Sequence, residues 1–136
     1  MVKVIISKEK DNFFVMLKKI YRLKEREVKK VLGKTKPFFS YGIVLNVKKN
    51  KKNYNRFAII IGSKSVNNNV TRNFFRRRFY DFISKKNLVN YSLWEEKFYD
   101  FVFVVKKQTK LDKKDLKTIL DFEKDLSFLE KKFKTH

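Results

Sequence analysis

The sequence contains no cysteine and a single histidine, His136. It therefore has neither a disulfide framework nor the ligands of a structural zinc finger. Glycine and proline are also scarce, with three residues and one residue, whereas 43% of the chain is hydrophobic and includes 15 Phe and 6 Tyr. A disordered basic tail is poor in aromatic residues, so this chain is expected to fold, and its length predicts one domain.

Long hydrophobic runs are missing as well. No uninterrupted apolar stretch approaches the roughly 18 residues of a transmembrane helix, and the amino terminus lacks the charged start, apolar core and cleavage site of a signal peptide. We therefore expect a cytoplasmic protein with no membrane partner.

Acidic residues are few, at 14 against 35 lysines and arginines, which leaves a formal charge of +21 and a pI near 10.1. Such a surplus predicts a polyanionic partner, either nucleic acid or an anionic membrane surface, and weighs against a small metabolic enzyme. AT-rich codon usage could account for part of the lysine. Arginine is the better indicator: four of the seven, Arg72, Arg76, Arg77 and Arg78, lie within seven positions, and guanidinium groups suit bidentate contact with phosphate.

The positive charge is concentrated in the middle of the chain. Residues 1–40, 41–94 and 95–136 carry net charges of +8, +11 and +2, and Asp81 is the one acid of the middle segment. A polyanion is expected to bind there.

Hydrophobic periodicity and turn residues predict alternating helices and strands. Helices are expected at 22–32, 70–86 and 112–133, and strands at 41–47, 57–62 and 99–105. The strand at 57–62 suits a central position and should form an antiparallel hairpin with 41–47, while 87–98 is a loop containing Trp94. On the last helix, six residues should face inward: Leu116, Ile119, Leu120, Phe122, Leu126 and Leu129.

The helix at 70–86 has two different faces. At 100° per residue, an arc of about 140° carries polar side chains, and the opposite side carries phenylalanines that pack. The polar arc holds Arg72, Asn73, Arg76, Arg77 and Tyr80, and the apolar side holds Phe75, Phe79 and Phe82. A solvated surface is the plain alternative, but the helix offers only Asp81 as an acid for i,i+4 pairs. We therefore interpret this face as a phosphate-binding surface, with the asparagines 67–69 capping the helix and its amino end open to a phosphate oxygen.

The stretch 63–81, SKSVNNNVTRNFFRRRFYD, resembles the signature of the bacterial ribonuclease P protein component, in which a Ser-Lys-Lys turn leads into an Arg-Asn-Arg helix. Arg22-Leu23-Lys24 matches the family's Arg-Leu-Lys, 99–106 its last strand and 111–133 its final helix, so the resemblance covers most of 16–133. Three positions depart from it: Phe74 replaces the second Arg of the motif, Ser65 the second Lys and Asn67 a Gly. Phe74 could stack on a base or simply pack.

The resemblance also suggests a domain division. Residues 1–15 have no counterpart in the family and Met16 resembles its usual start, so we expect 1–15 to be an extension, disordered or not translated, and 16–136 to be the ribonuclease P protein domain.

The resemblance implies an α+β fold of order αβββαβα, a ribosomal-protein-like two-layer sandwich with one sheet of about four strands and a left-handed crossover. It also implies an endoribonuclease whose RNA subunit, with bound Mg²⁺, removes the 5′ leader of precursor tRNA while the protein holds that RNA and the leader. The residues expected to contact the catalytic RNA are Lys64, Arg72, Asn73, Arg76, Arg77 and Tyr80, with Arg22 and Lys24 as further candidates.

The family binds the leader in a cleft between its first helix and the sheet, often on aromatic residues. The matching positions are Val28, Leu32 and Asn46, which would stack poorly, and Phe38, Phe39, Tyr41 or Tyr54 could compensate. We expect no catalytic residue and no metal ligand in the polypeptide, because the central basic region offers only Asp81 as a carboxylate.

Two other classes of protein fit the composition. A ribosomal or other structural RNA-binding protein of similar fold would carry the same charge. A helical DNA-binding module would place the arginine helix in a major groove, but the predicted strands and crossover disfavour it, so DNA is not an expected partner.

Overall fold

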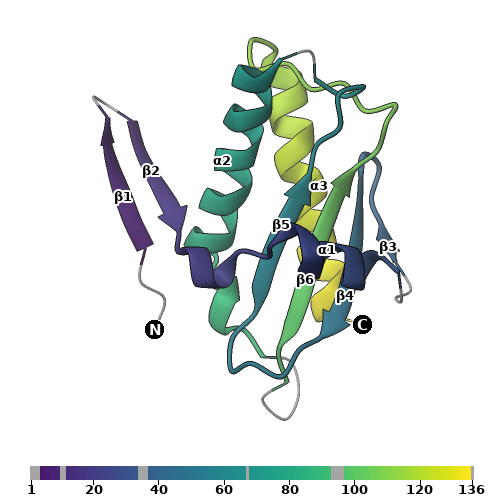
Figure 1. The fold of residues 1–136 in the computed structure, drawn as a ribbon. Helices are drawn as coiled ribbons and strands as arrows, with labels where there is room; N and C mark the ends of the chain where they lie inside the picture. Colours follow the sequence, from purple (N-terminus) through teal and green to yellow (C-terminus); the bar gives the residue numbers. More distant parts are fainter. Residues whose placement is uncertain (1–3, 10–11, 34–36, 67, 93–96, 136) are drawn as a thin grey trace.

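The computed structural model describes residues 4–9, 12–33, 37–66, 68–92 and 97–135. In this part of the chain a four-stranded mixed sheet is covered by three α-helices (Figure 1). The strands of this sheet are β3 (Phe38–Phe39), β4 (Ile43–Lys49), β5 (Arg56–Ile60) and β6 (Tyr99–Val105). The helices are α1 (Glu25–Leu32), α2 (Asn69–Lys85) and α3 (Leu116–Lys134), with short 3₁₀ turns η1 (Lys19–Tyr21) and η2 (Leu88–Asn90).

β6 is a central strand, although it is the last strand in the sequence. The order across the sheet is β3-β4-β6-β5, with β6 antiparallel to β4 and parallel to β5. The predicted hairpin between 41–47 and 57–62 is therefore wrong, and β5 is an edge strand of this sheet. The reason is that β6 is an almost continuous apolar run, and a strand buried on both faces needs backbone partners on both sides.

The connection from β5 through α2 to β6 joins two parallel neighbours. In Figure 1 both strands point upward, β6 lies to the right of β5, and α2 lies behind the sheet, so the crossover is left-handed. Right-handed crossovers prevail in general, and here the family resemblance predicted the exception. From α1 onward the order αβββαβα is also confirmed.

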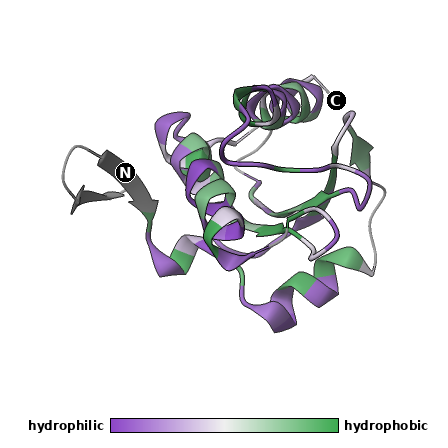
Figure 2. Cartoon of the chain, turned by 90° about the horizontal axis from the view of Figure 1, so that it is seen from above, coloured by the Kyte–Doolittle hydropathy of each residue, from purple (hydrophilic) through white to green (hydrophobic). Residues whose placement is uncertain are grey.

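The two faces of the sheet are covered differently. Figure 2, viewed from above, shows α2 and α3 on one side of the sheet and α1 on the other. Beneath α2 and α3 lies a large aromatic core that includes Phe57, Phe75, Phe79, Phe101, Phe103 and Phe122. Beneath α1 the fully buried cluster consists of Val31, Ala58 and Val102, with Leu23 and Val28 packed against it. Most of the hydrophobic stabilisation, at roughly 1.5–3 kcal/mol for each buried large side chain, therefore lies on the α2 and α3 side.

Two predicted boundaries or faces need correction. α1 begins at Glu25 rather than Arg22, because Arg22 forms a parallel bridge with Phe57 and the amide of Leu23 donates to the Phe57 carbonyl at 2.9 Å. On α3, Leu116 and Leu120 are 66% and 51% exposed. Both lie about 60–100° around the helix from Ile119, on the side away from Leu129, so they miss the sheet.

Residues before the family domain form a hairpin that stands beside α2 (Figure 1). β1 (Val4–Glu9) pairs antiparallel with β2 (Asn12–Leu17), and Leu17 at its end is buried in the main core. The extension at 1–15 and the start at Met16 stay predictions. Trp94 and Asn67 lie outside the described residues.

Candidate nucleic-acid interface

α2 is built so that one side packs and the other presents polar groups. Asn68 caps its start, since its side-chain oxygen accepts from the amide of Thr71 at 2.8 Å, and this confirms the capping role expected for the asparagines. Phe75 and Phe79 are completely buried, as predicted, and Phe82 is partly buried. Because these rings fix the rotation of the helix, the polar arc must face away from the sheet.

The polar arc holds its side chains in a hydrogen-bonded row. Arg76 Nη1 donates to Asn73 Oδ1 at 2.9 Å. Arg72 Nε donates to the carbonyl of Ile61 at 3.0 Å, and its Nη1 donates to Asn69. These bonds use some donors of each guanidinium and leave others, so the row is fixed in direction before any ligand arrives. Asn73 and Arg77 are exposed.

Arg22 joins this surface from a distant part of the sequence. The bridge to Phe57 places it beside α2, and its guanidinium carbon lies 5.8 Å from the centre of the Tyr80 ring. Its Nε is buried and has no hydrogen-bond partner within the described part of the protein. Burial raises the pKa of Tyr80, although nearby Arg22 and Arg76 act in the opposite direction. The structure therefore brings three predicted residues, Arg22, Arg76 and Tyr80, to one place.

The remaining predicted RNA contacts lie at the two ends of this surface. Lys64 is exposed in the loop before α2, and its carbonyl accepts from Lys110 Nζ at 2.5 Å. Lys24 is exposed at the start of α1, two residues beyond Arg22. The predicted residues thus extend from the amino end of α2 along its arc to the start of α1. We call these eight residues the arginine face: Arg22, Lys24, Lys64, Arg72, Asn73, Arg76, Arg77 and Tyr80.

The fourth arginine of the cluster belongs to the interior. Both Nε and Nη2 of Arg78 donate to Glu123 Oε2 of α3, at 3.2 and 3.0 Å. Arg78 also lies 5.4 Å from the ring centre of Phe74, which packs edge-on against Phe75. Phe74 is therefore used for packing, and the arginine missing at that position is not replaced by an exposed ring.

Ser65 also serves the fold where the family has its second lysine. It is buried, its hydroxyl donates to the carbonyl of Lys106 at 3.0 Å, and its carbonyl accepts from the amide of Leu111 at 2.9 Å. A lysine could not make this compact pair of bonds, so the loop before α2 is tied to the chain that follows β6.

The predicted leader-cleft residues fall into two groups. Val28 and Leu32 lie on α1, and Asn46 lies opposite Val102 on the face of the sheet that α1 covers. Val28 is packed, Asn46 is buried, and Leu32 is 40% exposed at the rim. Tyr41 is 94% exposed and lines a different cavity, together with residues of α3. The α1 side of the sheet therefore holds three of the four.

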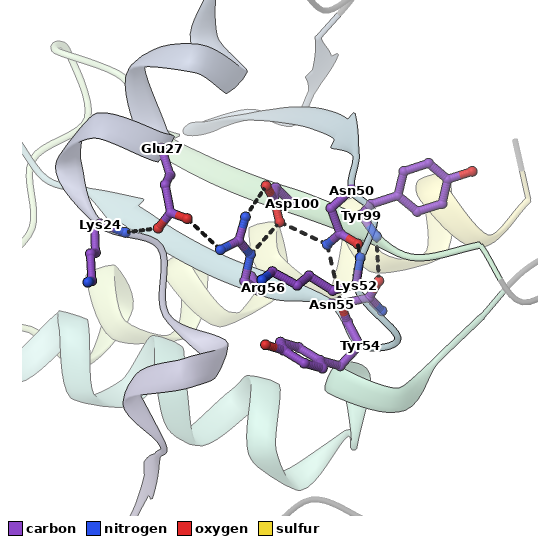
Figure 3. A network of polar contacts seen from close by, with 9 residues as sticks. All are labelled: Lys24, Glu27, Asn50, Lys52, Tyr54, Asn55, Arg56, Tyr99 and Asp100. Atoms are coloured by element: carbon purple, nitrogen blue, oxygen red, sulfur yellow. Dashed lines mark hydrogen bonds and ion pairs between the residues drawn. The ribbon is translucent and has the colours of Figure 1, made fainter.

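α1 is fixed to the sheet by a polar network that sequence reasoning missed (Figure 3). Arg56 of β5 donates to both oxygens of Asp100 on β6, at 2.9 and 2.8 Å, and to Glu27 of α1 at 2.5 Å. Asn50 Nδ2 donates to Asp100 at 2.9 Å. Burial would raise the pKa of Glu27, but the Lys24 amide and Arg56 outweigh it and lower that pKa. The network sets the position of α1 above the sheet.

Two signals could have predicted this network. Arg56 is an arginine outside the cluster in a chain that mostly uses lysine, and Asp100 is an acid inside the apolar strand 99–105. A buried carboxylate requires a partner, and a bidentate arginine is the common choice. The pairing itself depends on β5 and β6 being neighbours, which the sequence did not reveal.

A metal site built by the polypeptide is not visible in the described ranges. No three carboxylate or imidazole side chains there lie close enough to hold a metal ion. These residues do not fit a protein-bound Mg²⁺, and we derive no step through one. In the same ranges, no helix is long and apolar enough to cross a membrane.

Comparison with known proteins identifies the family. No curated protein sequence matches the chain. In solved structures, the ribonuclease P protein of Staphylococcus aureus is 20% identical, with a TM-score of 0.65, over 84% of this chain and 95% of that one. A mutant of the S. aureus protein with defective mRNA degradation activity gives 19%, 0.63, 85% and 90%. These likenesses confirm the fold. The model of the family described as ribonuclease P matches residues 17–127, and the chain therefore belongs to the bacterial ribonuclease P protein family.

Proposed function

We propose that this chain is the protein subunit of ribonuclease P. In this role it binds the catalytic RNA subunit and the 5′ leader of precursor tRNA, and it assists the Mg²⁺-dependent endonucleolytic cut that leaves mature tRNA 5′ ends. Family membership supports tRNA processing with an RNA partner. The observation that carries the finer proposal is the arginine face.

The arginine face suits a folded RNA backbone. Its cations come from three segments of the chain and occupy one side of α2, where the other side is filled by buried phenylalanines. Arg78, the arginine that Glu123 neutralises, points to α3 instead. Guanidinium groups held in fixed directions can each contact a phosphate, and every contact releases counterions from the RNA.

The leader is expected on the α1 side of the sheet. Leu32 is exposed at the rim and Asn46 lies on the sheet below, while the Arg56 network holds α1 at a set height above both. The aliphatic and amide groups here offer shape and hydrogen bonds rather than stacking. We therefore expect weak dependence of binding on leader sequence.

The chemical step is assigned to the RNA subunit. When bound there, Mg²⁺ would activate the attacking water and stabilise the leaving oxygen. The polypeptide contributes binding and orientation, since its cations reduce phosphate repulsion between the RNA subunit and its substrate. We propose that it acts in the cytoplasm, where precursor tRNA is processed in bacteria.

The test is reconstitution with bacterial ribonuclease P RNA and precursor tRNA. The purified chain should stimulate cleavage at low Mg²⁺, and Arg76→Ala should weaken binding to the RNA subunit and make its salt dependence shallower by roughly one unit for each lost phosphate contact. Arg78→Ala is the matched control, because it removes the same charge from the same helix and should leave the salt slope unchanged. No stimulation of cleavage, together with tight binding to ribosomal RNA, would sink the proposal.

A further inference from the structure

A second surface of the molecule combines exposed aromatic rings with lysines. In the part of the chain that the structure describes, three aromatic side chains are more than half exposed: Phe39 at 52%, Tyr41 at 94% and Phe128 at 52%. They come from the end of β3, the following turn and α3. Aromatic rings usually contribute to a core or an interface, so three exposed together require an explanation.

Two lysines show that these rings gather at one corner. Lys132 Nζ donates to the carbonyl of Phe39 at 3.3 Å and lies 5.5 Å from the centre of the Phe128 ring. Lys106 Nζ donates to the carbonyl of Ser40 at 2.8 Å and lies 5.8 Å from the centre of the Phe39 ring. We call Phe39, Tyr41, Phe128, Lys106 and Lys132 the aromatic corner.

The turn that carries two of these rings is held rigidly. The Ser40 hydroxyl donates to the Ile43 carbonyl at 2.9 Å, and the Gly42 amide donates to the buried Asp125 carboxylate at 3.2 Å. The Gly42 carbonyl accepts from the Thr109 hydroxyl and from the Lys106 amide. A side chain at Gly42 would approach Asp125 to 2.8 Å, so only glycine lets the turn lie this close to α3.

This rigidity matters because it serves a side chain with almost no contacts of its own. Tyr41 is 94% exposed, so its ring contributes little to stability in the isolated chain. A ring held in a fixed direction loses little entropy when a planar partner stacks on it. The arrangement therefore suits a ligand with exposed planar groups.

The surrounding charge indicates which ligand. Lys106, Lys107 and Lys132 lie at the corner of a chain with net charge +21. Aromatic rings alternating with cations are the combination that binds single-stranded nucleic acid, in which bases stack on the rings and phosphates meet the cations. An apolar protein partner would leave these ammonium groups desolvated without anions.

We propose that the aromatic corner is a stacking site for unpaired bases of RNA. It lies at the β3 edge of the sheet, whereas Arg22 and α2 lie beside β5 at the opposite edge (Figure 1). It is thus separate from the arginine face and from the α1 side of the sheet. The proposal rests on the proposed function only in taking RNA as the polyanion.

The experiment measures fluorescence anisotropy of a labelled unstructured RNA of ten nucleotides and of an RNA duplex of equal length with the full chain. Tyr41→Ala, Phe39→Ala and Phe128→Ala should each weaken binding of the single strand by roughly five-fold or more, and should change duplex binding less than two-fold. Tyr41→Phe should retain wild-type binding, because stacking needs the ring and not the hydroxyl. A 4-thiouridine in the single strand should cross-link to the corner.

Leu120→Ala is the matched control, because Leu120 is 51% exposed on the same helix as Phe128 but has no aromatic ring. Equal losses for this variant, equal losses for strand and duplex, or wild-type binding by Tyr41→Ala would each overturn the proposal. The proposed function would survive any of these results if Arg76→Ala still altered the salt dependence of binding to ribonuclease P RNA.

Discussion

The two faces of the central sheet are stabilised by different means. On the α2 and α3 side, stacked and edge-on rings such as Phe57 against Phe101 at 5.1 Å form a deep core. On the α1 side, a small aliphatic cluster is supplemented by the directional bonds of Arg56 to Asp100 and Glu27. Burial of area is tolerant of small shifts, whereas a bidentate pair fixes position. The comparison suggests that the first face provides stability and the second sets the geometry of a binding surface.

The largest expected effect lies in the aromatic core. Phe79 is completely buried, and its ring centre is 4.9 Å from that of Phe103. Phe79→Ala should lower the free energy of unfolding by about 3–5 kcal/mol, through lost burial and the cavity left behind. Urea unfolding followed by circular dichroism measures this loss. Phe128→Ala, an exposed phenylalanine, is the control and should change stability by less than about 0.5 kcal/mol.

The next effect separates the two faces. Asp100→Ala leaves the Arg56 guanidinium, whose side chain is 14% exposed, without its main partner, and should cost about 3 kcal/mol. The amides of α1 should lose protection in hydrogen exchange before those of α2, because the network holds α1 to the sheet. Arg56→Lys keeps the charge but not the paired bonds, and should fall between wild type and Asp100→Ala. Equal loss of protection in both helices would contradict the assigned role of the network.

The smallest effect is a difference in pH dependence. The pKa of Glu27 is lowered below its ordinary 4.5, so its stabilisation is present above that pH and is lost as pH falls through the lowered value. Burial raises the pKa of Asp125 above 3.8, despite its hydrogen bonds to Ser40 and Gly42, so its ionisation destabilises the fold as pH rises through the raised value. The two carboxyls, one on each face, therefore act with opposite sign.

Two amide variants test this difference. Glu27→Gln should make stability rise less between pH 3 and pH 7, in a range about these carboxyl pKa values, and Asp125→Asn should make it rise more, each by within about 1 kcal/mol. Asparagine can still accept from the Gly42 amide, so Asp125→Asn tests the charge alone. The measurement is the free energy of urea unfolding across this pH range. Slopes that change in the same direction would refute the assignment.

Local sequence patterns predicted much of the fold. Asn68 as a cap and the packing of Phe75 and Phe79 follow from properties within one helix, and all were found where expected. Strand positions were near their final bounds, but the pairing of 41–47 with 57–62 was wrong because β6 inserts between them. That insertion depends on contacts across more than forty residues, which periodicity does not encode.

The candidate site shows the same division. The arc from Arg72 to Tyr80 could be read from helical spacing, whereas the approach of Arg22 to Tyr80 depends on its bridge to Phe57. Charge counting also did not separate Arg78, which pairs with Glu123, from Arg76. Whether an arginine faces solvent or a carboxylate on another helix is decided by tertiary packing.

The place of β6 at the centre of the sheet bears on synthesis of the chain. β4 and β5 are made early but are not paired with each other, and both take their partner from residues 99–105. Closing these long loops costs entropy that no earlier strand contact repays. During translation the sheet therefore waits until β6 has left the ribosome. Until then the arginines of α2 are exposed as part of an unfinished domain, which predicts that an RNA partner is bound only after synthesis is nearly complete.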